Sequence, residues 1–185
     1  MNISATDWVE PMRGPLVVVP VSALDAWRGW TDDRVVREDG AGPDDYDRAC
    51  GVKGLAGVIG VGGDGAQALV LGDEPAASCF VAERRVFLRW LAADSEAGLI
   101  AAAEAVLTDP GTPWEECGTW VTEGPAVLMN SADTGVELSR GYPGGGRPEQ
   151  APVPLPAGVW RIRAVHARAD ERSWVGLVQV LPAAG

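Results

Sequence analysis

A glycine-rich stretch, Gly57–Pro75, most constrains what this chain can fold into. Within it, Gly60–Gly65 matches G-x-G-x-x-G, the pattern with which dinucleotide-binding folds bring backbone N–H groups against a pyrophosphate at a helix N-terminus. That chemistry requires a helix of several turns directly after the glycines. Here the short segment Ala66–Leu71 follows, and then Gly72 and Pro75 interrupt any helix.

The same stretch is better interpreted as a β-hairpin. Leu55–Val61 and Ala66–Leu71 are apolar segments of strand length, and Gly62–Gly65 lies between them as a glycine turn. We therefore expect two antiparallel strands here rather than a cofactor site. A regulatory protein that binds a small ligand or a nucleotide at the Gly60–Gly65 turn is the first alternative hypothesis.

Acidic residues are concentrated in the first two-thirds of the chain. The formal net charge of the 185 residues is −11. Residues 1–118 hold 20 acidic and 9 basic residues, whereas residues 119–185 hold six of each. Such a field repels nucleic-acid phosphates and anionic membranes and attracts cationic partners. The alternative is that the acidity serves solubility alone. We expect no nucleic-acid partner and no membrane partner.

The cysteines predict neither disulfides nor a metal site. Cys50, Cys79 and Cys117 are widely spaced, no C-x-x-C occurs, and one histidine does not complete an ordinary zinc site. We find no signal peptide and no apolar run of membrane-spanning length. These features predict a cytoplasmic protein with reduced cysteines and no cofactor, and they leave the oligomeric state open.

Apolar runs of strand length dominate the rest of the chain. The runs that we expect to form strands are Leu16–Pro20, Ser78–Ala82, Val86–Leu91, Cys117–Thr122, Pro125–Met129, Gly135–Leu138, Gly158–Ala167 and Ser173–Leu181. The one convincing helix is Asp94–Thr108, which ends before Pro110 and Gly111. Ser22 is expected to cap a shorter helix, and Arg140–Pro156 is expected to be a loop because it is rich in glycine and proline.

This pattern predicts an α+β protein that is mainly antiparallel β-sheet, with one main helix at about residues 94–108 and a β-sandwich-like C-terminal lobe. We expect an acidic α+β lobe with the glycine-turn hairpin at residues 1–112 and a mostly-β lobe at residues 113–185. One continuous domain is the alternative.

Tryptophans and acidic residues together indicate a partner-binding surface. Trp27 and Trp30 are three residues apart and share a face if the turn between them is helical. After the charged Thr31–Pro43 loop, Asp44 or Asp45 can cap a short helix. Such tryptophan pairs occur in cores and at interfaces. The predicted partner-binding residues are Trp27, Trp30, Asp44, Asp45, Tyr46, Asp47, Asp73 and Glu74.

Catalytic motifs are not evident in the sequence. His166, the sole histidine, ends an apolar strand face, and no G-x-S-x-G, P-loop or H-E-x-x-H is present. Adjacent carboxylates in loops are mostly solvated. The pairs are Asp32/Asp33, Asp44/Asp45, Asp73/Glu74 and Glu115/Glu116. We therefore expect a binding protein and no enzyme. An enzyme that uses His166 or a carboxylate pair is the second alternative.

Short motifs that lie along nearly the whole chain carry a family resemblance. They are Trp8–Glu10 with Gly14–Leu16, Trp27 with Gly29, Asp45–Cys50, Ala68–Pro75, Arg89-Trp90 with Ala93-Asp94, Pro113–Glu115, Gly124–Leu128 and Leu155–Gly158. In order and spacing the chain resembles the bacterial immunity protein 21 family. Two departures are Met129–Ala132, where Phe-Asp-Ser-Ala is expected, and Met12–Gly14, where a Gly-Gly pair is usual.

The resemblance implies a non-enzymatic cytoplasmic inhibitor that binds and neutralises one cognate toxin of a bacterial polymorphic toxin system. The acidic N-terminal two-thirds agree with a cationic toxin such as a nuclease, because complementary charge raises the association rate.

Overall fold

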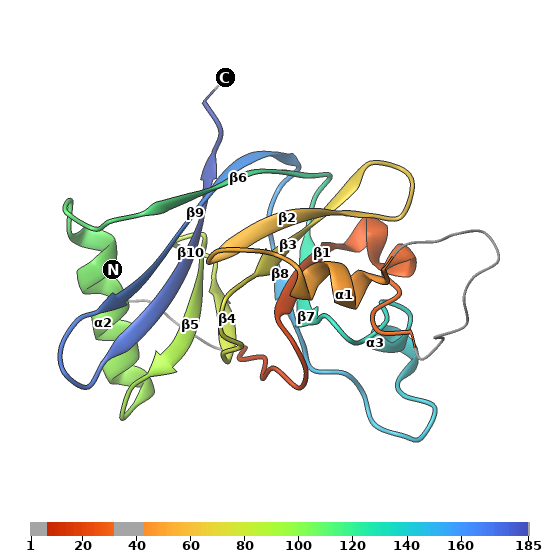
Figure 1. The fold of residues 1–185 in the computed structure, drawn as a ribbon, viewed down its shortest axis with the longest axis horizontal. Coiled ribbons are helices and arrows are strands. Elements are labelled where there is room, and N and C mark those ends of the chain that lie inside the picture. Colours follow the sequence, from red (N-terminus) through yellow and green to blue (C-terminus); the bar gives the residue numbers. More distant parts are fainter. Residues whose placement is uncertain (1–6, 32–42, 185) are drawn as a thin grey trace.

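The glycine-rich stretch forms the predicted β-hairpin. In the computed structural model, which describes residues 7–31 and 43–184, β2 (Ala56–Val61) pairs antiparallel with β3 (Ala66–Leu71) (Figure 1). In the turn, Gly62 and Gly65 have φ angles of 61° and 81°. Residues with a Cβ rarely adopt these backbone angles, so the turn requires glycine at both positions. Strand β3 begins directly after Gly65, and no helix follows the glycines.

The hairpin belongs to the first of two five-stranded antiparallel sheets. Its strand order is β2-β3-β1-β7-β8. Strand β1 (Leu16–Pro20) is central and pairs with β3 and with β7 (Ala126–Asn130), and β7 pairs with β8 (Gln150–Val153). All five residues of β1 are buried, because other elements cover both faces of this strand.

The second sheet has the order β4-β5-β10-β9-β6. These strands are β4 (Ser78–Val81), β5 (Val86–Ala92), β10 (Trp174–Pro182), β9 (Gly158–Arg168) and β6 (Glu115–Thr122). Strands β9 and β10, both expected from the sequence, pair antiparallel as a C-terminal hairpin. Strands from before and after residue 112 pair with each other in both sheets, as β1 does with β7 and β5 with β10.

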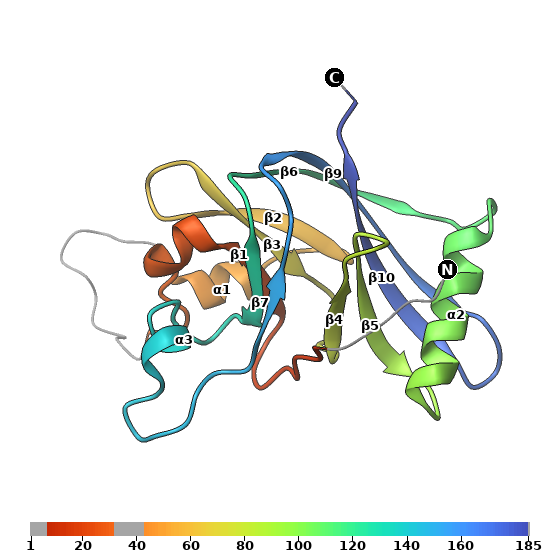
Figure 2. The ribbon, with the colours of Figure 1, turned by 180° about the vertical axis from the view of Figure 1, so that it is seen from behind.

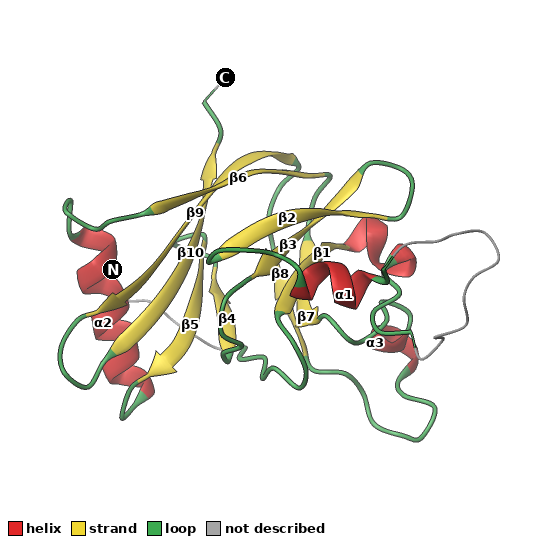
Figure 3. Ribbon diagram, in the orientation of Figure 1, coloured by secondary structure: helices red, strands yellow, loops and turns green. Residues whose placement is uncertain are grey.

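The two sheets stack face to face, and helices cover both outer faces (Figures 1 and 3). Side chains such as Leu128, Trp120 and Ile162 fill the core between the sheets. Helix α2 (Glu96–Thr108) packs on the outer face of the second sheet. The outer face of the first sheet is covered by the 3-10 helix η1 (Val21–Ala26), α1 (Asp45–Cys50) and α3 (Glu137–Arg140). Figure 2 shows the same layers from behind. The prediction of a mainly antiparallel α+β protein is confirmed.

Three local predictions were wrong. Ser22 caps no helix, because η1 begins at Val21 with Pro20 at its N-cap position and no side-chain cap. Gly135–Leu138 forms no strand, and its residues lead into α3. Strand β8 lies inside the predicted Arg140–Pro156 loop, at a sheet edge where Pro152 needs no ladder N–H. Of the predicted Thr31–Pro43 loop, residues 32–42 and with them the Asp32/Asp33 pair lie outside the described residues.

Candidate functional site

Asp44 and Asp45 shape the short helix α1. Asp44 caps it, since its Oδ1 accepts a hydrogen bond from the backbone N–H of Asp47 at 2.7 Å. Its Oδ2 accepts from the backbone N–H and the hydroxyl of Thr31, at 2.9 and 3.1 Å. Asp45 is 9% exposed, accepts from the N–H of Arg28 at 2.7 Å and pairs with Arg48. Both carboxylates therefore link the segment Arg28–Thr31 to the start of α1.

The carboxylate of Asp47, by contrast, holds no other described residue in place. Asp47 is exposed, and its side chain has no hydrogen-bond or ion-pair partner among the residues that the structure describes. It follows Tyr46, whose ring is half-buried. The neighbouring Cys50 thiol and partial burial raise the pKa of Tyr46 above its usual value. The acids of α1 thus differ in role, because Asp44 and Asp45 hold the fold and Asp47 faces solvent.

The two tryptophans of the predicted surface lie in different environments. Trp27 is 1% exposed, and its indole N–H donates to the carbonyl of Ser131 at 3.2 Å. Trp30 is 46% exposed, and the Arg13 guanidinium lies 5.3 Å from the centre of one of its rings. Met12 is 69% exposed. Trp27 therefore supports the surface from beneath, and Trp30 is the aromatic side chain that a partner can contact.

The Arg13 guanidinium lies over Trp30, Tyr46 lies close to Gly14, and Met12 and Asp47 are exposed neighbours of these residues in the chain. We call Met12, Arg13, Trp30, Tyr46 and Asp47 the α1 surface. Asn130 holds its N-terminal part in place. The Asn130 side chain accepts from the N–H of Met12 at 2.7 Å and donates to the carbonyl of Glu10 at 3.0 Å. Aspartate, which the family resemblance leads one to expect at this position, has no N–H to donate. The departure at Asn130 therefore suits the local hydrogen bonding of this chain.

Asp73 and Glu74 lie in the loop after β3, beside the second sheet. Arg89 in β5 holds this loop, because its guanidinium donates to the carbonyls of Gly72 and Glu74 at 2.7 and 2.6 Å. Asp73 adopts a φ of 61° and places its carboxylate 3.4 Å from Nδ1 of His166. No hydrogen bond or ion pair between described residues joins this loop to α1. The predicted surface therefore divides into two groups.

Arg89 of β5 is buried and lies 3.5 Å from the half-buried His166 of β9, with β10 between the two strands. Arg89 is 1% exposed, and burial lowers its pKa to about 10. Burial and the neighbouring Arg89 also lower the pKa of His166. Gly176 of β10 lies between them, and a Cβ there would come within 3.0 Å of the Arg89 Cβ and 3.2 Å of the His166 ring. Among the described residues, no serine or cysteine is hydrogen-bonded to His166. The pair links the second sheet to the loop after β3.

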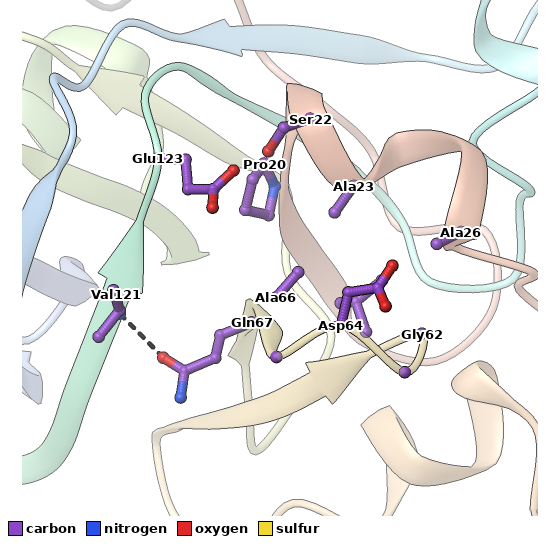
Figure 4. Close-up of a pocket in the computed structure, with 13 residues that line it drawn as sticks. Pro20, Ser22, Ala23, Ala26, Gly62, Asp64, Ala66, Gln67, Val121 and Glu123 are labelled. Atoms are coloured by element: carbon purple, nitrogen blue, oxygen red, sulfur yellow. Dashed lines mark hydrogen bonds between the residues drawn. The ribbon is translucent and has the colours of Figure 1, made fainter.

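The glycine turn borders a hollow of about 320 Å³, which Figure 4 shows. The turn lines one side, η1 another, and the end of β6 a third. Of the described residues, the charged ones that line the hollow are Asp64 and Glu123, and none is basic. Because carboxylates repel phosphate and β3 follows the glycines directly, the residues present do not fit a nucleotide phosphate.

The described ranges hold no group of three or more histidine, cysteine, aspartate and glutamate residues that could bind a metal ion. Cys50, Cys79 and Cys117 are free thiols, exposed, buried and half-buried in that order. Over the same ranges no helix is long and apolar enough to cross a membrane. The features that stand out in the structure are therefore surfaces: the α1 surface, the Asp73–Glu74 loop and the acidic hollow.

The described part of the chain is a two-sheet, mainly antiparallel protein with acidic and aromatic side chains on its surface. The model of one family, Immunity protein 21, matches residues 7–173. The chain therefore belongs to the immunity protein 21 family, and the resemblance drawn from its motifs is confirmed. Immunity protein families are generally non-enzymatic and imply a toxin as protein partner. Searches of curated proteins and of solved structures found no match.

Proposed function

We propose that this protein binds and neutralises a cognate bacterial polymorphic toxin in the cytoplasm, and that the toxin presents a cationic face, as a nuclease does. The observation that carries the proposal is the family match over residues 7–173. The net charge of −11 supports the cationic partner, because complementary charge steers the encounter of two proteins and raises their association rate.

The α1 surface is the contact that we propose. Trp30 offers a large exposed ring with the Arg13 guanidinium over it, and tryptophan is enriched among the residues that dominate binding energy. Asp47 adds an exposed carboxylate at the rim, where charge acts mainly on the association rate. Trp27, Asp44 and Asp45 act from within, because they fix the backbone that presents these side chains. The Asp73–Glu74 loop is a second acidic contact in this proposal.

The test begins with the gene beside the one for this chain. We expect it to encode a secreted protein with a C-terminal toxin domain, whose expression arrests growth unless this chain is co-expressed. With that purified domain as the probe, Asp47→Lys should lower the association rate constant by about two- to tenfold at low salt and flatten its salt dependence. Trp30→Ala should instead raise the dissociation rate.

Glu83→Lys is the matched control for Asp47→Lys. Glu83 is exposed in the turn between β4 and β5, and its replacement changes the net charge by the same amount. An equal effect of the two variants would remove the α1 surface from the proposal while leaving toxin binding intact. Failure of the wild-type chain to bind the domain or to restore growth would contradict the proposed function itself.

A further inference from the structure

The hollow beside the glycine turn has the chemistry of a contact site for a basic side chain. Figure 4 shows Glu123, from the end of β6, and Asp64, from the glycine turn, on opposite sides of the hollow. Within the described part of the chain neither carboxylate has a hydrogen-bond or ion-pair partner, and both residues are exposed. Their charge is therefore not used by the fold.

Exposed valines adjoin the hollow. Five large hydrophobic side chains are exposed among the described residues, and three of them are the valines Val21, Val121 and Val159, at 47–50% exposure. Val121 lines the hollow and lies opposite Val159 in the β6–β9 ladder. Val21 precedes the lining residue Ser22 in η1. Single exposed valines are ordinary, but a group beside a concave acidic site is typical of an interaction surface.

The floor of the hollow is fixed by hydrogen bonds between the two sheets. Gln67 of β3 accepts a hydrogen bond from the N–H of Val121 through its side-chain oxygen at 2.9 Å, drawn as a dashed line in Figure 4. The carbonyl of Gln67 accepts from the indole N–H of Trp120 at 3.0 Å. A surface that is ordered before binding loses less conformational entropy when a partner docks on it.

We infer that this hollow receives an arginine or lysine side chain of the toxin, with the three valines packing against apolar atoms around it. The inference rests on the proposed function and adds a second contact to it. Two exposed carboxylates with no basic side chain among the described lining residues attract a cation, and a guanidinium or ammonium group hydrogen-bonds to carboxylates directly. The same carboxylates repel a phosphate, a nucleic acid and an anionic lipid surface.

The position of the hollow allows one partner to reach it together with the α1 surface. Helix η1 lines the hollow through Ala23 and Ala26, and the chain continues from Ala26 to Trp30 in the α1 surface. Figure 1 shows the β2–β3 turn, η1 and α1 at the same end of the molecule. A toxin with a broad cationic face therefore has two adjacent acidic contacts available.

The test compares two double variants of the full chain that remove the same charge. Asp64→Asn with Glu123→Gln neutralises the hollow, and Glu83→Gln with Glu171→Gln neutralises two other exposed acids. Against the neighbouring gene's toxin domain, the hollow variant should raise Kd about tenfold or more, chiefly through faster dissociation, whereas the control should raise it less than about threefold. Unfolding midpoints should stay at the wild-type value in both, since all four side chains are exposed.

Hydrogen–deuterium exchange of the wild-type complex gives an independent readout. Toxin binding should slow amide exchange in residues 62–66 and 121–124. Equal Kd values for the two double variants, or slowed exchange confined to residues 43–50, would overturn the hollow as a contact while toxin binding stands. No binding by the wild-type chain would instead contradict the proposed function.

Discussion

Gly135 packs directly against the backbone of η1, and its replacement by alanine tests how closely the two segments approach. Its N–H donates to the carbonyl of Trp27 at 3.0 Å. A Cβ on Gly135 would lie 1.8 Å from the carbonyl oxygen of Leu24 and 2.5 Å from its carbon. Real Cβ atoms essentially never come within 3.0 Å of such atoms, and both are backbone atoms that no rotamer change can move. Gly135→Ala must therefore displace η1 or the loop beneath it.

The expected cost follows from three contributions. Overpacking in a well-packed region costs about 1–3 kcal/mol. Loss of the Gly135–Trp27 hydrogen bond costs about 1 kcal/mol. Restriction of the unfolded chain by alanine offsets about 0.4–1 kcal/mol. The free energy of unfolding should therefore fall by roughly 1–3.5 kcal/mol. Urea unfolding, followed by far-UV circular dichroism, should show a midpoint lower by about 0.5–1.8 M for an m-value of ~2 kcal/mol/M.

Gly63→Ala supplies the control, because it makes the same chemical change in open space. A Cβ on Gly63 meets nothing within 4 Å, and its φ lies outside the left-handed region. This variant should keep the wild-type stability or gain up to about 1 kcal/mol. If the two variants unfold within about 0.5 kcal/mol of each other, the close approach of Gly135 to η1 is refuted.

Two further predictions concern titratable groups. Burial and Arg89 hold the pKa of His166 below the 6.5 of the unfolded chain, so the unfolded state binds the proton first and stability falls as the pH drops from about 7 through the folded pKa. His166→Gln should flatten the urea midpoint against pH in that window, and an unchanged slope would contradict this. Burial raises the pKa of Cys79 to about 12, so at pH 8 a thiol reagent should modify exposed Cys50 quickly and Cys79 only after unfolding; equal rates would contradict its burial.

The sequence predicts well those elements whose signal is local. The hairpin at 56–71 follows from two apolar segments that flank glycines, and the structure keeps those bounds within one residue. Helix α2 carries its own stop signals and its own cap, since Ser95 accepts a hydrogen bond from the N–H of Gly98. Asp44 likewise caps α1 from three residues away. Each prediction needed only residues that are near one another in the chain.

The sequence fails where contacts across the fold decide the outcome. Trp27 and Trp30 have the spacing of a shared helix face, yet η1 ends at Ala26, and the chain then turns Trp27 inward and Trp30 outward. Arg89 is the one charged residue in the apolar strand β5, and its contacts with the Gly72 and Glu74 carbonyls come from a segment that local patterns do not connect to it. Asp64 and Glu123 line the same hollow but come from segments far apart in the chain, so no local motif predicts it.

The structure also shows which acidic residues of the N-terminal excess have partners within the fold. Asp44 and Asp45 belong to the acidic excess, but their oxygens are taken by backbone N–H groups and by Arg48. Replacing either one changes the geometry of α1 as well as the charge, so lost binding there would not identify a contact. Exposed acids without internal partners can be neutralised with little cost to the fold. Asp47, Asp64 and Glu123 are exposed and have no such partner within residues 7–31 and 43–184, and for that reason the binding experiments rest on them.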